Sequence, residues 1–200
     1  MDLILVRHPQ PDVASDVCYG QTDVPLIEPI QHGTLVARIR SAIGDRPLTA
    51  VHSSHLTRAR IPASWLSSMF HAPHHVDTRL AEMHFGEWEM RAWDEIDRSA
   101  LDAWAQNVAG FAPPGGESAR DVVVRVDAWA RELRSQASDN DEVHVVIGHA
   151  GPIRLHMATA LRLPTTTCLS WALDFGGICH LHIADDGNAR LIHWNVQTHV

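Results

Sequence analysis

The sequence predicts an α/β fold, a three-layer α/β/α sandwich around a mixed, mostly parallel central sheet. Short apolar runs typical of buried strands alternate with helical patterns through most of the chain. The chain then ends in strand-like segments joined by short turns, which extend such a sheet with antiparallel strands. A length of 200 residues suits one domain spanning 1–200, with a helical insertion at about 82–116.

The first predicted strand is Leu3–Val6, a short apolar run that ends in Arg7-His8-Pro9. Because prolines interrupt strand pairing, this run delivers Arg7 and His8 to a loop. A helical pattern follows over Gln31–Ile43.

The second predicted strand, Leu48–His52, leads into a helix from about His55 to Phe70. Ser53 and Ser54 precede this helix and are residue types that cap helix N-termini. Pro62 predicts either a kink in the helix or a place near its first turns.

A third strand is predicted at Val76–Leu80 and a further helix at Ala92–Val108, which Pro113-Pro114-Gly115-Gly116 ends. The next helix opens at Ser118, with Asp121 three residues later as a capping box. One apolar stripe at helical spacing runs along that helix: Val122, Val126, Trp129 and Leu133.

The last quarter begins with a strand at Val143–Ile147, which ends in Gly148-His149-Ala150-Gly151, and a helix at Pro152–Leu163. Strand-like segments complete the chain at Leu169–Phe175, Ile178–Ala184 and Ala189–Trp194. Gly177 and the turn Asp186-Gly187-Asn188 separate these segments.

Composition excludes several classes of function. The formal net charge is −8 and all 16 basic residues are arginine, so the chain has neither a Walker A lysine nor a Schiff-base lysine. Dispersed arginines in an acidic chain argue against nucleic-acid binding. No stretch reaches the ~18 to 20 apolar residues of a membrane span. The acidic start and the three widely spaced cysteines lead us to expect a cytoplasmic protein with reduced thiols.

Functional residues are expected where the predicted strands end. Arg7-His8, the segment from Ser53 to Arg58, and His149 all follow strands, and ligand sites of open α/β sheets collect at the carboxyl ends of strands. Paired arginines bind phosphate in a bidentate way. A neutral histidine beside them can attack phosphorus, and a carboxyl group from the loop at Glu82 can protonate a leaving oxygen.

Five segments, in order, resemble motifs of the histidine phosphatase (phosphoglycerate mutase-like) superfamily. They are the Arg-His signature Leu3–His8, the Ser-Ser-x-Leu-x-Arg-Ala segment at 53–59, the acid-bearing loop at 80–89, Gly115-Gly116-Glu117-Ser118, and the second-histidine motif at 145–154. The segment from Cys18 to Leu26 and His8-Pro9-Gln10-Pro11 look most like the alpha-ribazole-5'-phosphate phosphatase branch, which serves cobalamin assembly. The resemblance implies a phosphoglycerate mutase-like fold.

The resemblance also implies a role for each matching residue. His8 would be the nucleophile that becomes phosphohistidine, and Glu82 would be the proton donor and later the base. Arg7, Arg58 and His149 would be catalytic and would hold the phosphoryl oxygens. Tyr19, Gly20 and Ala150 would contact the substrate, a small phosphate ester such as alpha-ribazole-5'-phosphate. No cofactor, metal, nucleic acid or membrane is implied, and a homodimer is compatible with the family.

The chain departs from the family pattern at several positions. Pro9 replaces the usual Gly and has no N–H to offer a phosphate. His55 stands where Pro is normal. Glu87 and Glu89 share the loop of Glu82, so either could be the acid instead.

Other functions compete with the phosphatase hypothesis. A phosphoglycerate mutase and a phosphate-ester binding module without turnover remain alternatives. Two histidine groups could also supply metal ligands, which would suit a metal carrier: His180 with His182 on one strand face, and His71, His74 and His75 in a predicted loop.

Overall fold

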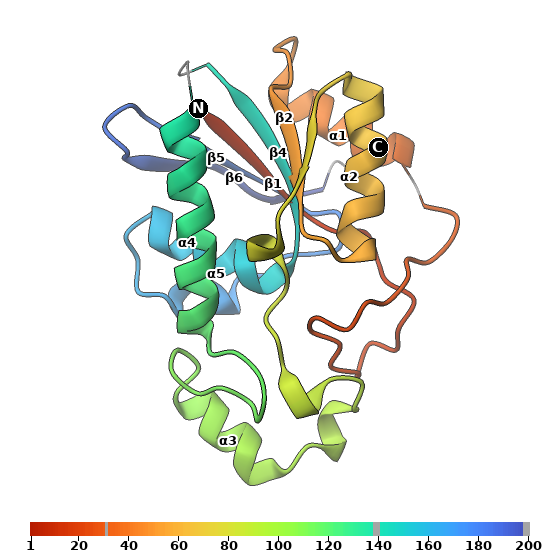
Figure 1. The fold of residues 1–200 in the computed structure, drawn as a ribbon, viewed down its shortest axis with the longest axis vertical. Helices are drawn as coiled ribbons and strands as arrows, with labels where there is room; N and C mark the ends of the chain where they lie inside the picture. The colour runs from red at the N-terminus through yellow and green to blue at the C-terminus, as the bar shows by residue number, and fades with distance from the viewer. Residues whose placement is uncertain (31, 138–140, 198–200) are drawn as a thin grey trace.

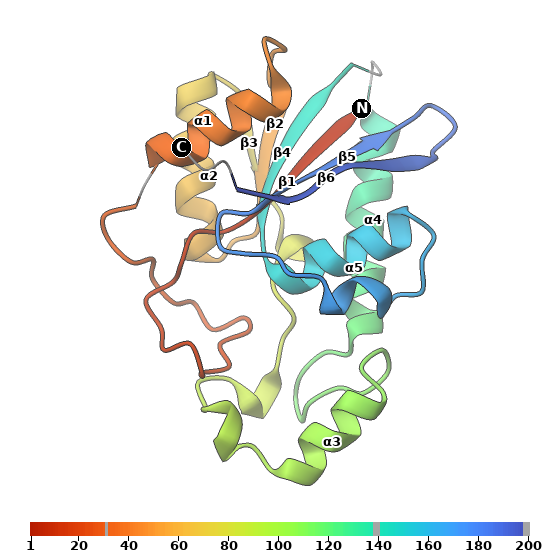
Figure 2. The ribbon, with the colours of Figure 1, turned by 180° about the vertical axis from the view of Figure 1, so that it is seen from behind.

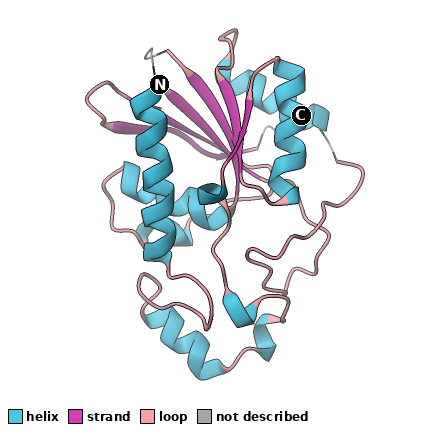
Figure 3. Ribbon diagram, viewed as in Figure 1, coloured by secondary structure: helices cyan, strands magenta, loops and turns pink. Residues whose placement is uncertain are grey.

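The computed structural model describes residues 1–30, 32–137 and 141–197. It contains one six-stranded sheet in the order β3-β2-β4-β1-β5-β6 (Figures 1 and 3). The strands are β1 (Asp2–Arg7), β2 (Ala50–Ser53), β3 (His74–Val76), β4 (Val143–Gly148), β5 (Ile178–Ile183) and β6 (Ala189–Val196). β3, β2, β4 and β1 run parallel, whereas β5 and β6 pair antiparallel. The mixed, mostly parallel sheet is therefore confirmed.

Helices cover both faces of the sheet, as Figures 1 and 2 show from opposite sides. One face carries α1 (His32–Ile43) and α2 (Thr57–Phe70), and the other carries α4 (Ala119–Gln136) and α5 (Ala150–Ala160). A shorter helix, α3 (Arg98–Gln106), lies beyond the carboxyl ends of the parallel strands. No helix in the described part of the chain is long and apolar enough to cross a lipid bilayer.

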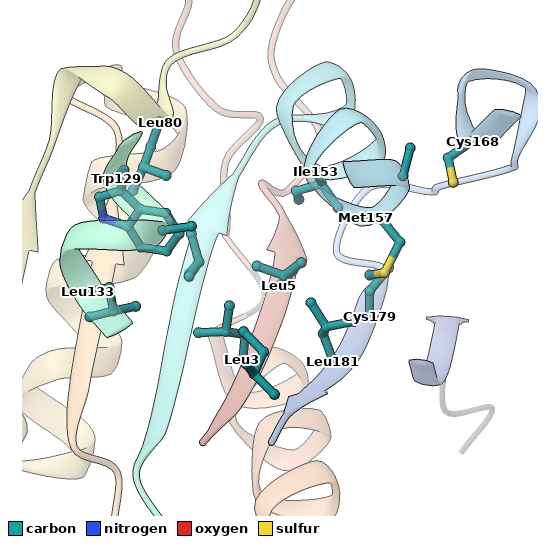
Figure 4. Close-up of a cluster of buried hydrophobic side chains, with 14 of the residues drawn as sticks. Leu3, Leu5, Leu80, Trp129, Leu133, Ile153, Met157, Cys168, Cys179 and Leu181 are labelled. Atoms are coloured by element: carbon teal, nitrogen blue, oxygen red, sulfur yellow. The ribbon is translucent and has the colours of Figure 1, made fainter. Parts of the chain in front are cut away.

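The alternation of apolar side chains along β1 explains the three layers. Leu3 and Leu5 point into the core beneath α4 and α5, which Figure 4 shows, whereas Ile4 and Val6 point into the core beneath α1 and α2. Because side chains alternate across a strand, a strand buried on both faces reads as one continuous apolar run. The predicted stripe of α4 packs inward as expected, and Ser118 caps the helix with Asp121. All three cysteines are buried and free.

Three predicted elements were wrong. The segment Val76–Leu80 is not a strand: β3 is earlier, and Thr78–Leu80 forms a 3-10 turn capped by the Asp77 side chain. The predicted helix Ala92–Val108 is divided into two elements. The 3-10 turn Trp93–Glu95 comes first, and α3 then begins separately, with Asp97 as its N-cap. The predicted strand Leu169–Phe175 begins as the 3-10 turn η4 (Thr167–Ser170).

Helix starts also differ from the sequence prediction. α2 begins after Leu56, with no side-chain cap, because Ser53 and Ser54 make other hydrogen bonds. Pro62 lies inside α2, near its start. α5 begins at Ala150 rather than at Pro152. The predicted first residue of α1, Gln31, lies outside the described residues.

Candidate active site

Two histidines meet at the carboxyl ends of β1 and β4. In this parallel pair Arg7 lies opposite Gly148, so His8 and His149 follow adjacent strand ends. The His8 amide donates to the Gly148 carbonyl at 2.9 Å, and the two imidazole centroids are 5.1 Å apart. Both side chains are almost completely buried, at 1% and 0% exposure. The sheet register therefore brings together the two histidines that the sequence singled out.

His8 is held in one tautomer. Its Nδ1 lies 2.6 Å from the Pro9 carbonyl oxygen. Because a carbonyl only accepts, Nδ1 carries the proton and Nε2 keeps its lone pair. Burial, followed by the charges of Arg58 and Arg7, lowers the pKa of His8 to about 3. Pro9 therefore contributes its carbonyl, and the ring is neutral with Nε2 available as a nucleophile.

Arg7 is anchored by the loop before β5. Its Nη1 donates to the Leu173 carbonyl at 2.6 Å, and its guanidinium lies 3.7 Å from the ring centroid of Phe175. The same ring lies 5.6 Å from the His8 ring. Phe175 thus holds Arg7 beside His8 through a cation–π contact.

Arg58 is a fully buried arginine on α2. It donates to the carbonyls of Thr22 and Gly20, and its guanidinium lies 5.0 Å from the ring centroid of Tyr19. Burial lowers the pKa of Arg58, and the negative charge of Glu82 opposes that shift. Tyr19 and Gly20 therefore lie at the site through their contacts with Arg58. Burial raises the pKa of Tyr19.

His149 is oriented by Ser54. β2 pairs with β4 so that Ser53 lies opposite Ile147, which places Ser54 beside His149. Ser54 Oγ lies 2.7 Å from His149 Nε2. Burial, with the charges of His8 and Arg58, lowers the pKa of His149 well below its ordinary value. His149 is therefore a second neutral imidazole.

Three buried nitrogens of these side chains have no hydrogen-bond partner among the described residues: Arg7 Nε, Arg58 Nε and His149 Nδ1. Buried donors normally find an acceptor. α5 also begins here, at Ala150, and a helix N-terminus favours an anion. The arrangement suits an oxyanion bound next to His8.

Glu82 faces the same helix start. Its Oε2 accepts from the Gly151 amide at 3.3 Å and its Oε1 from the Met83 amide at 2.9 Å. A Cβ at Gly151 would lie 2.3 Å from Glu82 Oε1, so the approach requires glycine.

The other two acids of this loop are placed differently. Glu89 accepts from the amides of Gln21, Thr22 and Phe85 and from the Thr22 hydroxyl, which ties two loops together. Glu87 is exposed. Glu82 is therefore the carboxylate of this loop that lies against α5.

A buttress of polar side chains holds the Glu82 backbone. Arg125 on α4 donates to the Glu82 carbonyl at 3.0 Å and pairs with Glu117, and Gln21 donates to the same carbonyl at 2.8 Å. Glu117 also accepts from the His84 amide at 3.0 Å. The Gly-Gly-Glu-Ser segment thus supports the acid-bearing loop.

Three histidines of the two groups considered as metal ligands make local hydrogen bonds: His74, His180 and His182. His180 and His182 both bond Asp2 Oδ1, at 3.0 and 2.9 Å. His74 bonds Ser53, and His74 and His75 lie on β3 rather than in a loop. In the described ranges, no group of three or more His, Cys, Asp or Glu is arranged to hold a metal ion.

Two residues have a role at the site that the sequence analysis did not predict: Ser54, which was expected only as a helix cap, and Phe175. Ser54 lies inside the matched segment 53–59, so its position there was the available signal. Phe175 had no such signal, because only the fold brings the loop before β5 to β1.

The chain is similar to known phosphatases over most of its length. The sequence model described as "Histidine phosphatase superfamily (branch 1)" matches residues 3–197. Glucosyl-3-phosphoglycerate phosphatase of Mycolicibacterium vanbaalenii is 34% identical over 171 residues, which cover 81% of this chain and 75% of that protein. Adenosylcobalamin/alpha-ribazole phosphatase of Salmonella typhimurium is 29% identical over 182 residues, covering 88% and 87%.

The fold of the chain is also similar to that of a solved phosphatase structure. The native mycobacterial glucosyl-3-phosphoglycerate phosphatase superposes with a TM-score of 0.84 at 29% identity, covering 98% of this chain and 99% of that one. The phosphoglycerate mutase-like fold is therefore confirmed. The chain belongs to the histidine phosphatase superfamily and is a phosphatase of that superfamily.

Proposed function

We propose that the protein is a metal-independent phosphomonoesterase that works through a phosphohistidine at His8. The observation that carries the proposal is the state of the His8 ring, which is buried and neutral, with Nδ1–H held by the Pro9 carbonyl. The positive charges of Arg58 and Arg7 act on this ring. These guanidinium groups supply the charge that a phosphoryl transition state needs.

In the first half-reaction, His8 Nε2 attacks phosphorus and the bond from phosphorus to the ester oxygen breaks. The leaving oxygen takes the proton of the Glu82 carboxyl group and departs as an alcohol. Arg7, Arg58 and His149 Nδ1 bind the phosphoryl oxygens, because each of these side chains at the site has a buried nitrogen without a partner among the described residues. The products are an alcohol, a phosphohistidine and a Glu82 carboxylate.

In the second half-reaction, the Glu82 carboxylate takes a proton from water as the water oxygen attacks phosphorus. The bond from phosphorus to Nε2 breaks, and inorganic phosphate leaves. Glu82 is protonated again and His8 is again a neutral imidazole, so the cycle closes. Using one carboxyl group as acid and then as base is general acid–base catalysis with a single residue.

For the substrate, we propose a glucosyl-3-phosphoglycerate-type ester first and alpha-ribazole-5'-phosphate second. The 34% identical relative is named for the former. The latter is supported by the named activity of the Salmonella relative, whose match covers more of this chain, and by the similarity of residues 18–26 to that branch.

The test is phosphate release from a panel of esters with EDTA present. The panel holds p-nitrophenyl phosphate, glucosyl-3-phosphoglycerate, alpha-ribazole-5'-phosphate and 3-phosphoglycerate, the last also followed by NMR for isomerisation. The proposal predicts hydrolysis that EDTA does not affect and that His8→Asn abolishes. Isomerisation without phosphate release, or complete loss of hydrolysis under chelation, would contradict it.

A further inference from the structure

A cavity of about 440 Å³ lies between α4 and the part of the sheet formed by β3, β2 and β4. His52 on β2 and His144 on β4 form its floor, and Trp129 and Leu133 on α4 form one wall. The side chains that line it do not include those of the candidate active site. Pockets for small organic ligands have volumes of roughly 300–1,000 Å³, so this cavity is large enough for a ligand of its own.

The floor of the cavity consists of imidazoles where the rest of the sheet face is apolar. His52 lies opposite Val146 in the register of β2 and β4, so both side chains point to the same face of the sheet. That face also carries Leu3 and Leu5, which Figure 4 shows beneath α4 and α5. His144 is two residues before Val146 and points the same way. His52 and His144 are only 5% and 4% exposed, and buried polar side chains of this kind need an explanation.

Hydrogen bonds fix the tautomers of both imidazoles. His144 Nε2 lies 3.1 Å from Glu142 Oε2, and His52 Nε2 lies 3.1 Å from His144 Nδ1. Burial lowers the pKa of both histidines, which keeps the rings neutral. Because a carboxylate only accepts, His144 carries its proton on Nε2 and accepts at Nδ1. His52 therefore carries its proton on Nε2, and its Nδ1 keeps a lone pair.

This Nδ1 atom is available to a ligand. Within the described part of the chain, His52 makes one side-chain hydrogen bond, through Nε2, so Nδ1 has no partner. Nδ1 is also not one of the completely enclosed polar atoms, and the His52 side chain lines the cavity. The His75 ring stacks on the His52 ring at 5.3 Å and the Trp129 ring meets it edge-on at 5.6 Å. A nearly buried side chain, held on both sides, thus presents a hydrogen-bond acceptor to the cavity.

The charges around the cavity favour a positively charged ligand. Its charged lining residues are three carboxylates and one guanidinium: Asp77, Glu132, Glu142 and Arg79. Arg79 is already paired, at 2.6 Å from Asp77 and 2.7 Å from Glu132. Acidic side chains around a concave site concentrate cations there. An organic cation suits the cavity better than a metal ion, because no group of three or more ligating side chains in the described ranges is arranged to hold a metal.

We propose that this cavity binds an organic ammonium ion. An N–H of the ammonium group donates to His52 Nδ1, and its positive charge lies among the carboxylates of the rim. The carbon skeleton of the ligand packs against Trp129 and Leu133. This second site does not depend on the phosphatase mechanism, because the two sites share no side chain.

The experiment is an NMR titration of the ¹⁵N-labelled full chain at pH 7.5, with inorganic phosphate present to fill the phosphoryl site. The three probes are phenethylammonium, 2-phenylethanol and 3-phenylpropionate, which share an aromatic ring but end in a cationic, a neutral and an anionic group. The readouts are Kd and the amide signals of residues 52, 75 and 144. Phenethylammonium should bind most tightly and 3-phenylpropionate most weakly, with the shifts centred on these three residues.

Three variants separate the contributions to binding. His52→Phe keeps a ring but removes the acceptor, so the Kd of phenethylammonium should rise about tenfold to hundredfold, as for one hydrogen bond to a charged group. Glu132→Gln removes one exposed rim charge, so the Kd should rise about twofold to fivefold. Glu87→Gln is the matched control, because it removes an exposed carboxylate that does not line the cavity, and the Kd should stay unchanged.

Equal affinity for the three probes would mean that the cavity offers only apolar contact, and would overturn the inference. The same holds if phenethylammonium causes no saturable shift at residues 52, 75 and 144, or if Zn²⁺ shifts these signals while phenethylammonium does not. An unchanged Kd in both His52→Phe and Glu132→Gln would also overturn it. If His52→Phe does not fold, the comparison of Glu132→Gln with Glu87→Gln decides, and equal Kd values in these two variants would contradict the proposal.

Discussion

The hydroxyl of Ser54 lies 2.7 Å from Nε2 of His149, and both side chains are completely buried. Ser54 Oγ also accepts from the Leu56 amide at 3.3 Å. With a proton left to give, the hydroxyl donates to Nε2, and His149 then carries its own proton on Nδ1. Nδ1 is the atom without a partner among the described residues, so Ser54 makes His149 a donor toward the phosphoryl site.

Replacing Ser54 by Ala should remove the hydrogen bond that keeps the proton of His149 on Nδ1. We expect kcat/KM to fall about tenfold to hundredfold, because one charge-assisted donor to the transition state loses its orientation. Competitive inhibition by inorganic phosphate should weaken in parallel. The neighbouring Ser53→Ala is the control, since the Ser53 hydroxyl bonds His74 and the Ser54 carbonyl but not His149. Unchanged phosphate inhibition in Ser54→Ala, or an equal loss in Ser53→Ala, would refute this role.

The residue that protonates the leaving oxygen can be identified by comparing substrates whose leaving groups do and do not need a proton. Glu82→Gln removes the proton donor, so we expect kcat/KM for an alkyl phosphate to fall about 10²- to 10⁴-fold. The loss for p-nitrophenyl phosphate should be much smaller, because nitrophenolate leaves without a proton. The exposed Glu87→Gln is the matched control. Equal losses on both substrates in Glu82→Gln, or the selective loss in Glu87→Gln, would move the acid elsewhere.

Glu89 is expected to affect stability. Its carboxylate accepts four hydrogen bonds that join residues 21–22 to the loop at 85, and it is one-tenth exposed. Glu89→Gln replaces one acceptor oxygen by a donor, so the free energy of unfolding should fall by about 1.5–3 kcal/mol. Urea denaturation measures this, with Glu87→Gln again as the control. A variant as stable as wild type would show that these bonds contribute nothing net.

Stability should fall in mild acid. Burial lowers the pKa of both His8 and His52 from 6.5 to about 3, so the unfolded chain binds these protons at a higher pH than the folded chain does. The contribution of these two neutral histidines to the free energy of unfolding is thus fully present above pH 6.5. It is lost as the pH falls from there towards 3. Between pH 5.5 and 4.5 each histidine should cost about 1.4 kcal/mol. Urea denaturation across that range checks this, with His52→Gln expected to show a shallower slope. A free energy of unfolding that stays constant would contradict it.

The sequence predicted the sheet and much of the site for one physical reason. Apolar runs such as Leu3–Val6 reveal strands buried on both faces, and the parallel register then brings His8 and His149 together. It did not predict the short elements, because side-chain caps such as those of Asp77 and Asp97 divide segments that look continuous by hydrophobicity. Phe175 and Arg125 act through tertiary contacts with residues far along the chain, which no local pattern encodes.

The most direct test of the central claim is to trap the phosphorylated enzyme. Wild type, His8→Asn and His149→Asn are mixed with ³²P-labelled substrate and quenched in alkali, in which phosphohistidine is stable, and the label is then mapped by peptide. Phosphate should be found on His8 in wild type, be lost on acid treatment, and be absent from His8→Asn. Label on another residue, or full turnover by His8→Asn, would contradict the mechanism.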